Sequence, residues 1–260
     1  MRQRVKTSIV LAVLIIPAVL FGGWSYNIII GAVALIGTME LLQMANIETK
    51  SLPAIATYIG TLSIVYYHMI ASYIPEQLSD GIIPVFAVLL LLISTVIVPG
   101  FNFTKAGISA LTMGYVGVGS QAAIIIRQED LAIFVFILLV IVSTDIGAYF
   151  IGSKIGKRKL APLLSPNKSV EGSIGGIVLA LLTTSIYLNF ITLPYSYIIM
   201  LLIAIILSIT GQFGDLLESA FKRHFGVKDS GTILPGHGGI LDRFDSILFT
   251  LSMALILGVF

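Results

Sequence analysis

Nine apolar segments, each about 17–24 residues long, constrain what this chain can fold into more than any other feature. They cover residues 7–23, 26–45, 54–74, 82–99, 106–126, 130–151, 174–191, 195–218 and 244–260. Segments of this length span the hydrocarbon core of a bilayer as α-helices. They do not alternate apolar with polar residues, which argues against membrane strands, and helices satisfy their own backbone hydrogen bonds inside lipid. We therefore predict an all-α polytopic membrane protein with about nine transmembrane helices.

The composition excludes the main alternatives to a membrane protein. Only 11% of the 260 residues are charged and 57% are hydrophobic, whereas about 25% of residues are charged in ordinary soluble domains. The mean hydropathy is +1.03. A water-soluble chain of this size cannot cover so much apolar surface. We therefore exclude a soluble enzyme, a disordered protein and a secreted disulfide scaffold.

The positions of the basic residues predict how the chain is oriented in the membrane. If the N-terminus is cytoplasmic, 14 of the 15 Lys and Arg residues fall in cytoplasmic segments, and Arg127 alone falls outside. Lys and Arg are enriched in the cytoplasmic loops of membrane proteins. This asymmetry supports nine spans with a cytoplasmic N-terminus and an extracytoplasmic C-terminus.

We expect residues 1–260 to form a single integral membrane domain. Residues 1–140, which contain spans one to five, are predicted to be mainly scaffold. Residues 141–260 are the predicted catalytic region, because seven of the 13 acidic residues lie there. The long cytoplasmic loops are predicted at residues 152–173 and 219–243.

Two predicted helices each present an Asp-x-x-acid-Ser pattern on one face at the cytoplasmic side. The residues are Asp215, Glu218 and Ser219 at the end of the eighth span, and Asp242, Asp245 and Ser246 at the start of the ninth. Four carboxylates beside an apolar slab repel one another and need cations, and hard oxygen ligands suit Mg²⁺. Any single residue here could equally be an interfacial charge reaching the headgroups, but the whole pattern favours a site.

Basic residues and glycines around these acids suggest phosphate binding. The basic residues interleaved with the acids are Lys222, Arg223, Lys228 and Arg243, an arrangement expected where phosphate and metal share one site. Gly238 and Gly239 precede the ninth helix, where backbone N–H groups and the helix N-terminus favour anions. His237 either donates to a phosphate or acts as an acid/base, or it braces the loop, and both readings stay open.

A second polar block lies around the sixth and seventh spans. Asp145 is near the end of the sixth span, where an ionisable residue is costly and indicates function. Lys168 and Glu171 belong to a predicted polar turn before the seventh span. The basic residues within 154–159 fit topology signals or attraction to anionic headgroups.

Two further features have readings that do not require catalysis. Glu40 lies toward the cytoplasmic end of the second span, and its position fits a substrate cavity and the membrane interface equally well. Gly172 and Gly176 form a small-xxx-small pair, which favours close helix packing over chemistry.

The run of 27 residues at 219–245, SAFKRHFGVKDSGTILPGHGGILDRFD, resembles the signature of the phosphatidate cytidylyltransferases, also called CDP-diacylglycerol synthases. Every fixed position of that signature is present, which makes the match far more specific than a short motif. Residues 145–149 and 166–172 also resemble upstream segments of this family.

The resemblance implies a Mg²⁺-dependent integral membrane enzyme that joins CTP and phosphatidic acid into CDP-diacylglycerol and releases pyrophosphate. It implies an all-helical fold of three groups of three helices, a homodimer, and a possible second cation in a two-metal site. The expected location is a bacterial inner (plasma) membrane, with the active site facing the cytoplasm where CTP exists. We expect no nucleic-acid partner.

The resemblance, together with the charge pattern, assigns candidate roles. The expected metal ligands are Asp215, Glu218, Asp242 and Asp245. The expected catalytic residues, of which the basic ones would hold phosphates, are Lys222, Arg223, Lys228, Asp229, His237 and Arg243. The expected substrate-binding residues are Asp145, Lys168, Glu171, Ser219, Gly238, Gly239 and Ser246.

Two rival functions remain. An ion-coupled transporter would also have many spans and intramembrane acids, although its site would lie near the bilayer midplane rather than at one edge. A CTP-dependent lipid-alcohol kinase would release CDP instead of pyrophosphate. A CDP-alcohol phosphotransferase is disfavoured, because the sequence lacks an Asp-Gly-x-x-Ala-Arg motif.

Overall fold

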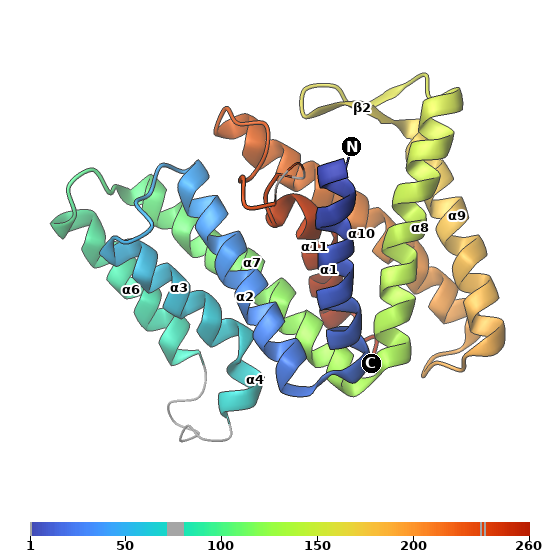
Figure 1. Cartoon of the computed structure of the whole chain (residues 1–260), viewed down its shortest axis with the longest axis horizontal. Helices are drawn as coiled ribbons and strands as arrows, with labels where there is room; N and C mark the ends of the chain where they lie inside the picture. The colour runs from blue at the N-terminus through green and yellow to red at the C-terminus, as the bar shows by residue number, and fades with distance from the viewer. Residues whose placement is uncertain (1, 72–80, 235, 237) are drawn as a thin grey trace. The chain divides into compact units, whose positions relative to one another are not determined.

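The computed structural model describes residues 2–71, 81–234, 236 and 238–260 (Figure 1). These residues divide into two compact units. Unit 1 contains the described residues up to Ile125 together with Phe225–Asp242, and unit 2 contains Ile126–His224 and Arg243–Phe260. Each unit is described by itself below.

Unit 1 is a set of packed helices followed by a returning loop. Its helices are α1 (Arg2–Phe21), α2 (Gly23–Met44), α3 (Leu52–Val65), α4 (Tyr67–Ile70), α6 (Ile82–Ile97) and most of α7 (Phe103–Glu129). Helix α1 packs against α2, α2 against α3, and α3 against α6. The later part of unit 1 is the loop at 225–240 and the first two residues of α11 (Leu241–Ile256).

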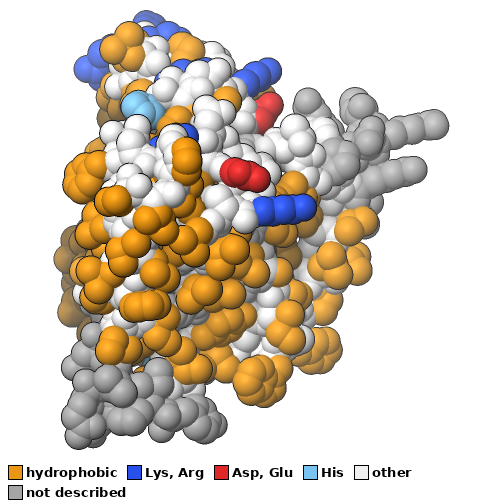
Figure 2. Space-filling model, turned by 90° about the vertical axis from the view of Figure 1, so that its left-hand side faces the viewer, with side chains coloured by type: hydrophobic (Ala, Val, Ile, Leu, Met, Phe, Trp, Pro, Cys, Tyr) orange, Lys and Arg blue, Asp and Glu red, His pale blue; other side chains and the backbone are white. Residues whose placement is uncertain are grey.

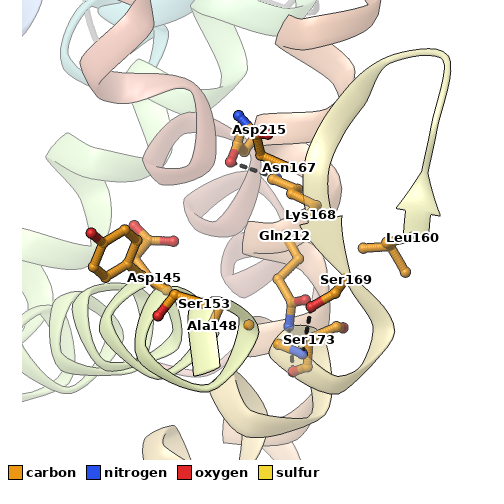
Figure 3. Close-up of a pocket in the computed structure, with 13 residues that line it drawn as sticks. Asp145, Ala148, Ser153, Leu160, Asn167, Lys168, Ser169, Ser173, Gln212 and Asp215 are labelled. Atoms are coloured by element: carbon orange, nitrogen blue, oxygen red, sulfur yellow. Dashed lines mark hydrogen bonds and ion pairs between the residues drawn. The ribbon is translucent and has the colours of Figure 1, made fainter. Parts of the chain in front are cut away.

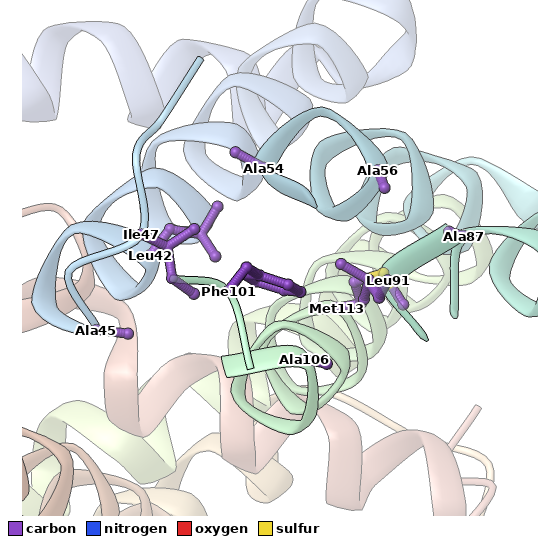
Figure 4. Packing of buried hydrophobic residues seen from close by; sticks show 10 residues of the cluster. All are labelled: Leu42, Ala45, Ile47, Ala54, Ala56, Ala87, Leu91, Phe101, Ala106 and Met113. Carbon is purple, nitrogen blue, oxygen red and sulfur yellow. The ribbon is translucent and has the colours of Figure 1, made fainter. Parts of the chain in front are cut away.

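The core of unit 1 is a cluster of buried apolar side chains (Figure 4). Leu42, Leu91, Phe101 and Met113 belong to it, and alanines fill the positions between the larger side chains. Gly60 of α3 lies so close to α6 and α7 that a Cβ there would meet the Met113 sulfur and would lie 3.0 Å from the Ala87 Cβ. A glycine at this position therefore lets the three helices approach one another closely.

Unit 2 is built from three long helices, a small hairpin and most of α11. Its elements are α8 (Leu131–Ile155), β1 (Lys159–Ala161), β2 (Ser165–Ser169), α9 (Val170–Phe190) and α10 (Tyr197–His224). Helices α8, α9 and α10 pack against one another. A Cβ on Gly172 would lie 2.8 Å from the Ala148 carbonyl oxygen, and one on Gly176 would lie 2.7 Å from that of Thr144. The predicted packing role of these two glycines is thereby confirmed.

The loop predicted at 152–173 contains a β-hairpin, which the all-α prediction did not include. Strands β1 and β2 pair antiparallel, with Lys159 opposite Ser169 and Ala161 opposite Ser165. The predicted polar turn before the seventh span is therefore the end of β2 followed directly by α9. The Ser169 hydroxyl caps α9 by accepting from the Gly172 N–H at 3.1 Å, so strand and helix meet without a connecting loop.

The loop predicted at 219–243 is shorter than expected. Helix α10 continues to His224, so the connection to α11 covers only residues 225–240. The Lys222 ammonium lies 2.8 Å from the Glu218 carboxylate one turn earlier. This i,i+4 pair, in which Glu218 is buried and Lys222 partly buried, stabilises the helix through residues that hydropathy alone places outside the span.

The described residues have the character of a membrane protein. Five of their helices are long and apolar enough to cross a bilayer, namely α2, α7, α8, α9 and α10. Shorter apolar helices cover Val10–Phe21, Leu52–Val65 and Ile82–Ile97. Each of the nine predicted segments overlaps an observed helix, and only residues 72–74 of the third fall outside the described residues.

The surface of α6 shows why these helices need an apolar environment. Val85, Phe86, Ile93 and Val96 are exposed large hydrophobic side chains on this one helix. Figure 2 shows a face on which hydrophobic side chains dominate and charged side chains are few. Apolar surface of this extent marks contact with a membrane or with another protein.

Candidate functional site

The candidate site in unit 2 is a pocket of about 540 Å³ between α8, the hairpin, α9 and α10 (Figure 3). This volume is within the usual range for small-molecule sites. The polar side chains that line it include Asp145, Ser153, Asn167, Lys168, Gln212 and Asp215. Sequence reasoning selected Asp145, Lys168 and Asp215 of this group.

An ion pair crosses the pocket from the hairpin to α10. The Lys168 ammonium lies 2.5 Å from Oδ2 of Asp215, and the two side chains are 24% and 41% exposed (Figure 3). Both groups are therefore open to solvent, so a ligand could compete for either of them. One turn before Asp215, the Gln212 amide donates to the Ser173 carbonyl at 3.4 Å.

Two further carboxylates, from α8 and α11, lie near the Lys168–Asp215 ion pair. Asp145 of α8, Asp215 of α10 and Asp245 of α11 lie close enough to act on one another's charge, and Lys168 acts on Asp145. Asp245 is only 8% exposed. Carboxylates near one another repel, so a cation close to them is favourable, and Lys168 is one such cation.

Glu218 and Lys222 extend the cluster along α10. The Glu218 side chain is 1% exposed, and its Oε2 accepts from the Lys222 ammonium at 2.8 Å. Its other oxygen, Oε1, is buried and has no hydrogen-bond donor among the described residues. A buried acceptor without a donor is costly. Unit 2 therefore contains an oxygen that a cation or a proton would satisfy.

The predicted metal set is divided between the two units. Asp215, Glu218 and Asp245 belong to unit 2, whereas Asp242 belongs to unit 1. Across residues 2–71, 81–234, 236 and 238–260, no three Asp, Glu or His side chains gather closely enough to hold one metal ion. The four-carboxylate ligand set therefore stays a prediction.

Asp242 is held by the loop that precedes it. Its Oδ2 accepts from the Ser230 N–H at 2.9 Å, the Ser230 hydroxyl at 3.0 Å and the Gly239 N–H at 2.9 Å. Gly238 has a φ of +86°, and a Cβ there would lie 2.6 Å from the same oxygen. Glycine at this position is therefore explained by backbone conformation and by space.

Three backbone N–H groups at the start of α11 donate to carboxylates of the chain. The Gly239 N–H is taken by Asp242, and those of Ile240 and Leu241 are taken by Glu40. Glu40 is fully buried, and its carboxylate also accepts from the Ser230 hydroxyl.

The structure describes all but one of the remaining predicted residues. Glu171 accepts from the backbone N–H groups of Lys157 and Arg158 and from the Arg158 guanidinium, at 3.0–3.1 Å. The Arg223 guanidinium donates to the Leu164 carbonyl at 3.4 Å, which links α10 to the hairpin turn. Ser246 is buried next to Asp245, and Ser219 is partly buried. Lys228, Asp229 and Arg243 are exposed, and His237 lies outside the described residues.

The model of the cytidylyltransferase family matches residues 2–260 of this chain. The chain belongs to the cytidylyltransferase family. The phosphatidate cytidylyltransferase of Bacillus subtilis (strain 168) is 45% identical over 259 residues, which cover 96% of this chain and 95% of that protein. The phosphatidate cytidylyltransferases of Staphylococcus saprophyticus and Staphylococcus haemolyticus are each 40% identical and cover 99% of this chain and 98% of their own length.

Membership of the cytidylyltransferase family confirms the resemblance read from residues 219–245. The similarity also includes the first 140 residues, where the sequence alone indicated little beyond topology.

Sequence reasoning assigned no role to three polar residues, two of which lie in unit 2 and one in unit 1. Asn167 and Gln212 line the pocket, and Ser230 bonds to both Glu40 and Asp242. Asn167 stands beside Lys168, and Ser230 stands between Asp229 and Gly231 in the signature. These neighbouring residues could have drawn attention to Asn167 and Ser230. The only sequence feature that marks Gln212 is its polar side chain within an apolar span.

Proposed function

We propose that this chain is a phosphatidate cytidylyltransferase, which transfers the cytidylyl group of CTP to phosphatidic acid. The products are CDP-diacylglycerol and pyrophosphate. One observation carries this conclusion: near-full-length similarity, at 38–45% identity, to proteins named for this activity.

The chemistry is an in-line displacement at phosphorus. A phosphate oxygen of phosphatidic acid forms a bond to the α-phosphorus of CTP, and the bond from that phosphorus to the bridging oxygen of the β-phosphate breaks. The lipid phosphate is already anionic at neutral pH, so a strong general base is not required. Positioning of the two phosphates and neutralisation of their charge supply most of the rate enhancement.

The pocket of unit 2 is lined by both positively and negatively charged side chains, which supports this proposal. Lys168 forms an ion pair with Asp215 in the structure. We propose that Lys168 binds a phosphate group of CTP or of the lipid. The basic residues proposed to hold the other phosphates are Lys222, Arg223, Lys228 and Arg243. Asp145, Ser219 and Ser246 are proposed to bind substrate, as are Glu171, Gly238 and Gly239.

Mg²⁺ fits the donors that the site offers. The oxygens come from Asp145, Asp215 and Asp245, which act on one another's charge, and from Glu218, whose buried Oε1 has no donor in the described part of the chain. Mg²⁺ is usually held by one or two carboxylates together with waters and substrate phosphates, so a complete protein cage is not needed. On the charge pattern and the family resemblance, and not on the geometry of the described residues, we propose Asp215, Glu218, Asp242 and Asp245 as its ligands.

Mg²⁺ would supply neutralising charge for the triphosphate and for the pyrophosphate leaving group. The number of acidic residues leaves room for a second cation. Both proposals about metal rest on the donor chemistry alone.

The membrane topology that fits this function has nine crossings. We propose a cytoplasmic N-terminus and an extracytoplasmic C-terminus, since this arrangement leaves only one of the 15 basic residues outside. The active site then faces the cytoplasm of a bacterium, at the inner membrane, where soluble CTP meets a membrane lipid. We also propose a homodimer, on the family resemblance alone.

The proposed function is tested with the full chain purified in detergent. With Mg²⁺, CTP and phosphatidic acid, we expect release of pyrophosphate that depends on the presence of both substrates. Release of CDP instead would favour the rival lipid kinase. A folded protein that releases neither product would contradict the enzyme proposal and favour the transporter.

A further inference from the structure

A buried carboxylate on α2 binds the loop that precedes α11. Oε1 of Glu40 accepts from the Ile240 N–H at 2.8 Å. Its Oε2 accepts from the Leu241 N–H at 2.9 Å and from the Ser230 hydroxyl at 3.0 Å. All four residues belong to unit 1. One side chain in the second helix therefore fixes three groups of the signature segment.

The burial of Glu40 makes these three bonds essential. The residue is 0% exposed, and within the described part of the chain no Lys, Arg or His forms an ion pair with it. A buried carboxylate is costly unless hydrogen bonds satisfy it, and bonds to a charged acceptor are stronger than neutral ones. The positive end of α11 adds a favourable field. Loss of the carboxylate would leave two N–H groups without their acceptor, and the Ser230 hydroxyl would keep only Asp242 as its acceptor.

Two glycines of the signature are explained by their distance from Glu40. A Cβ on Gly231 would lie 2.6 Å from Oε1 of Glu40. A Cβ on Gly239 would meet the Ser230 hydroxyl first and would lie 2.5 Å from Oε2 of Glu40. Neither glycine has a positive φ, so backbone conformation does not require glycine at these positions. Space for the Glu40 carboxylate requires glycine at position 231, and space for that carboxylate and the Ser230 hydroxyl requires it at position 239.

Ser230 connects Glu40 to Asp242. Its hydroxyl lies 3.0 Å from a carboxylate oxygen of each residue, and its own N–H donates to Asp242 at 2.9 Å. The hydroxyl has one hydrogen and can donate to one carboxylate at a time. The orientation of Asp242 therefore depends on a serine whose position Glu40 sets.

We infer that Glu40 is a positioning residue, which acts through Ser230 to hold Asp242 and the first turn of α11 in the orientation that cytidylyl transfer requires. This role rests on the proposed function, in which Asp242 is a metal ligand. Groups that orient a metal ligand through hydrogen bonds commonly change metal affinity or activity by about 10–100-fold when they are removed.

The test variant is Glu40→Gln in the full chain, purified in detergent. The amide has nearly the same shape but replaces one acceptor oxygen with an NH₂ group, which would face the N–H of Ile240 or Leu241. We expect the Mg²⁺ concentration for half-maximal pyrophosphate release to rise about tenfold. We also expect faster hydrogen exchange of the backbone amides in residues 230–241, measured without substrates.

Thr38→Val is the matched control. Thr38 lies on the same helix, is fully buried and donates to the Thr61 hydroxyl at 3.3 Å. Its loss removes a buried hydrogen bond from α2 without touching the loop, so we expect wild-type half-saturating Mg²⁺ and wild-type exchange at 230–241. Ser230→Ala should shift the Mg²⁺ dependence in the same direction as Glu40→Gln, because it removes the connecting hydroxyl.

The outcomes separate this role from a general loss of folded protein. Fewer folded molecules would lower the maximal rate but would not move the half-saturating Mg²⁺ concentration. An unchanged Mg²⁺ dependence in Glu40→Gln, or the same shift in Thr38→Val, would overturn the positioning role. A wild-type protein without activity on CTP would instead overturn the proposed function itself, and the role of Glu40 with it.

Discussion

The Lys168 ammonium lies 2.5 Å from Oδ2 of Asp215 and thereby joins the end of β2 to α10 across the pocket of unit 2. This pair places a cation that can bind phosphate against a carboxylate that can bind metal. A metal ion bound by Asp215 would leave Lys168 free to bind a phosphate of the substrate. The pair therefore suits a site where metal and phosphate arrive together.

Lys168→Ala should lower cytidylyl transfer by at least about tenfold, because a charged group that contacts a transferring phosphate stabilises the transition state. Lys159→Ala on the paired strand is the control, since that side chain is exposed and does not line the pocket. The rates of both variants are measured at saturating CTP. Equal rates in the two variants would show that Lys168 does not take part in cytidylyl transfer.

Asp215→Asn and Asp245→Asn should each abolish most activity while the protein still folds and inserts. Each change removes a charged oxygen donor from the proposed Mg²⁺ site but keeps the shape of the side chain. Glu129→Gln serves as the control, because Glu129 is exposed at the end of α7. Near-normal turnover of both Asn variants at saturating Mg²⁺ would exclude these residues as metal ligands.

Gly176→Ala should destabilise unit 2 by about 1–3 kcal/mol, since the added Cβ overpacks a close helix contact. That Cβ would lie 2.7 Å from the Thr144 carbonyl oxygen, whereas one on Gly107 would meet nothing within 4 Å. Gly107→Ala on α7 should therefore leave stability equal or slightly higher. Denaturation of both variants in detergent measures the difference, and equal midpoints would contradict the tight α8–α9 packing.

A tag placed after Phe260 should react only with reagents added outside the cell. This follows from the proposed nine crossings and from the asymmetry of the basic residues. A cysteine introduced at Lys50 should react only after the membrane is permeabilised, because the same topology places it in the cytoplasm. Labelling of the C-terminal tag from the cytoplasmic side would show that the number of crossings is wrong.

The helical membrane class was predictable because it depends on local hydropathy. Each long apolar run overlaps an observed helix, although the third contains two, α3 and α4. The spacing of Gly172 and Gly176 correctly indicated a helix contact. The hairpin was not predictable from hydropathy, since it depends on the Glu171 carboxylate binding the N–H groups of Lys157 and Arg158. The end of α10 was misplaced for a similar reason, because the Glu218–Lys222 pair extends the helix beyond its apolar part.

The site was predictable only where several charged residues stand close in sequence. Asp215 and Lys168 were each selected as polar residues beside a span, but their contact joins positions 47 residues apart. Glu40 stands 190 residues from Ser230, and nothing near Glu40 in the sequence indicates that it binds the signature segment. Contacts of this range depend on the folded helices, so a single sequence gives no sign of them.

The fate of the CTP phosphates tests the central claim most directly. The full chain is incubated with phosphatidic acid, Mg²⁺ and CTP labelled with ³²P at either the α- or the γ-phosphate, and lipid is then extracted. The account predicts that α-label enters the lipid fraction as CDP-diacylglycerol, while γ-label stays in water as pyrophosphate. Entry of γ-label into the lipid, or of neither label, would contradict it.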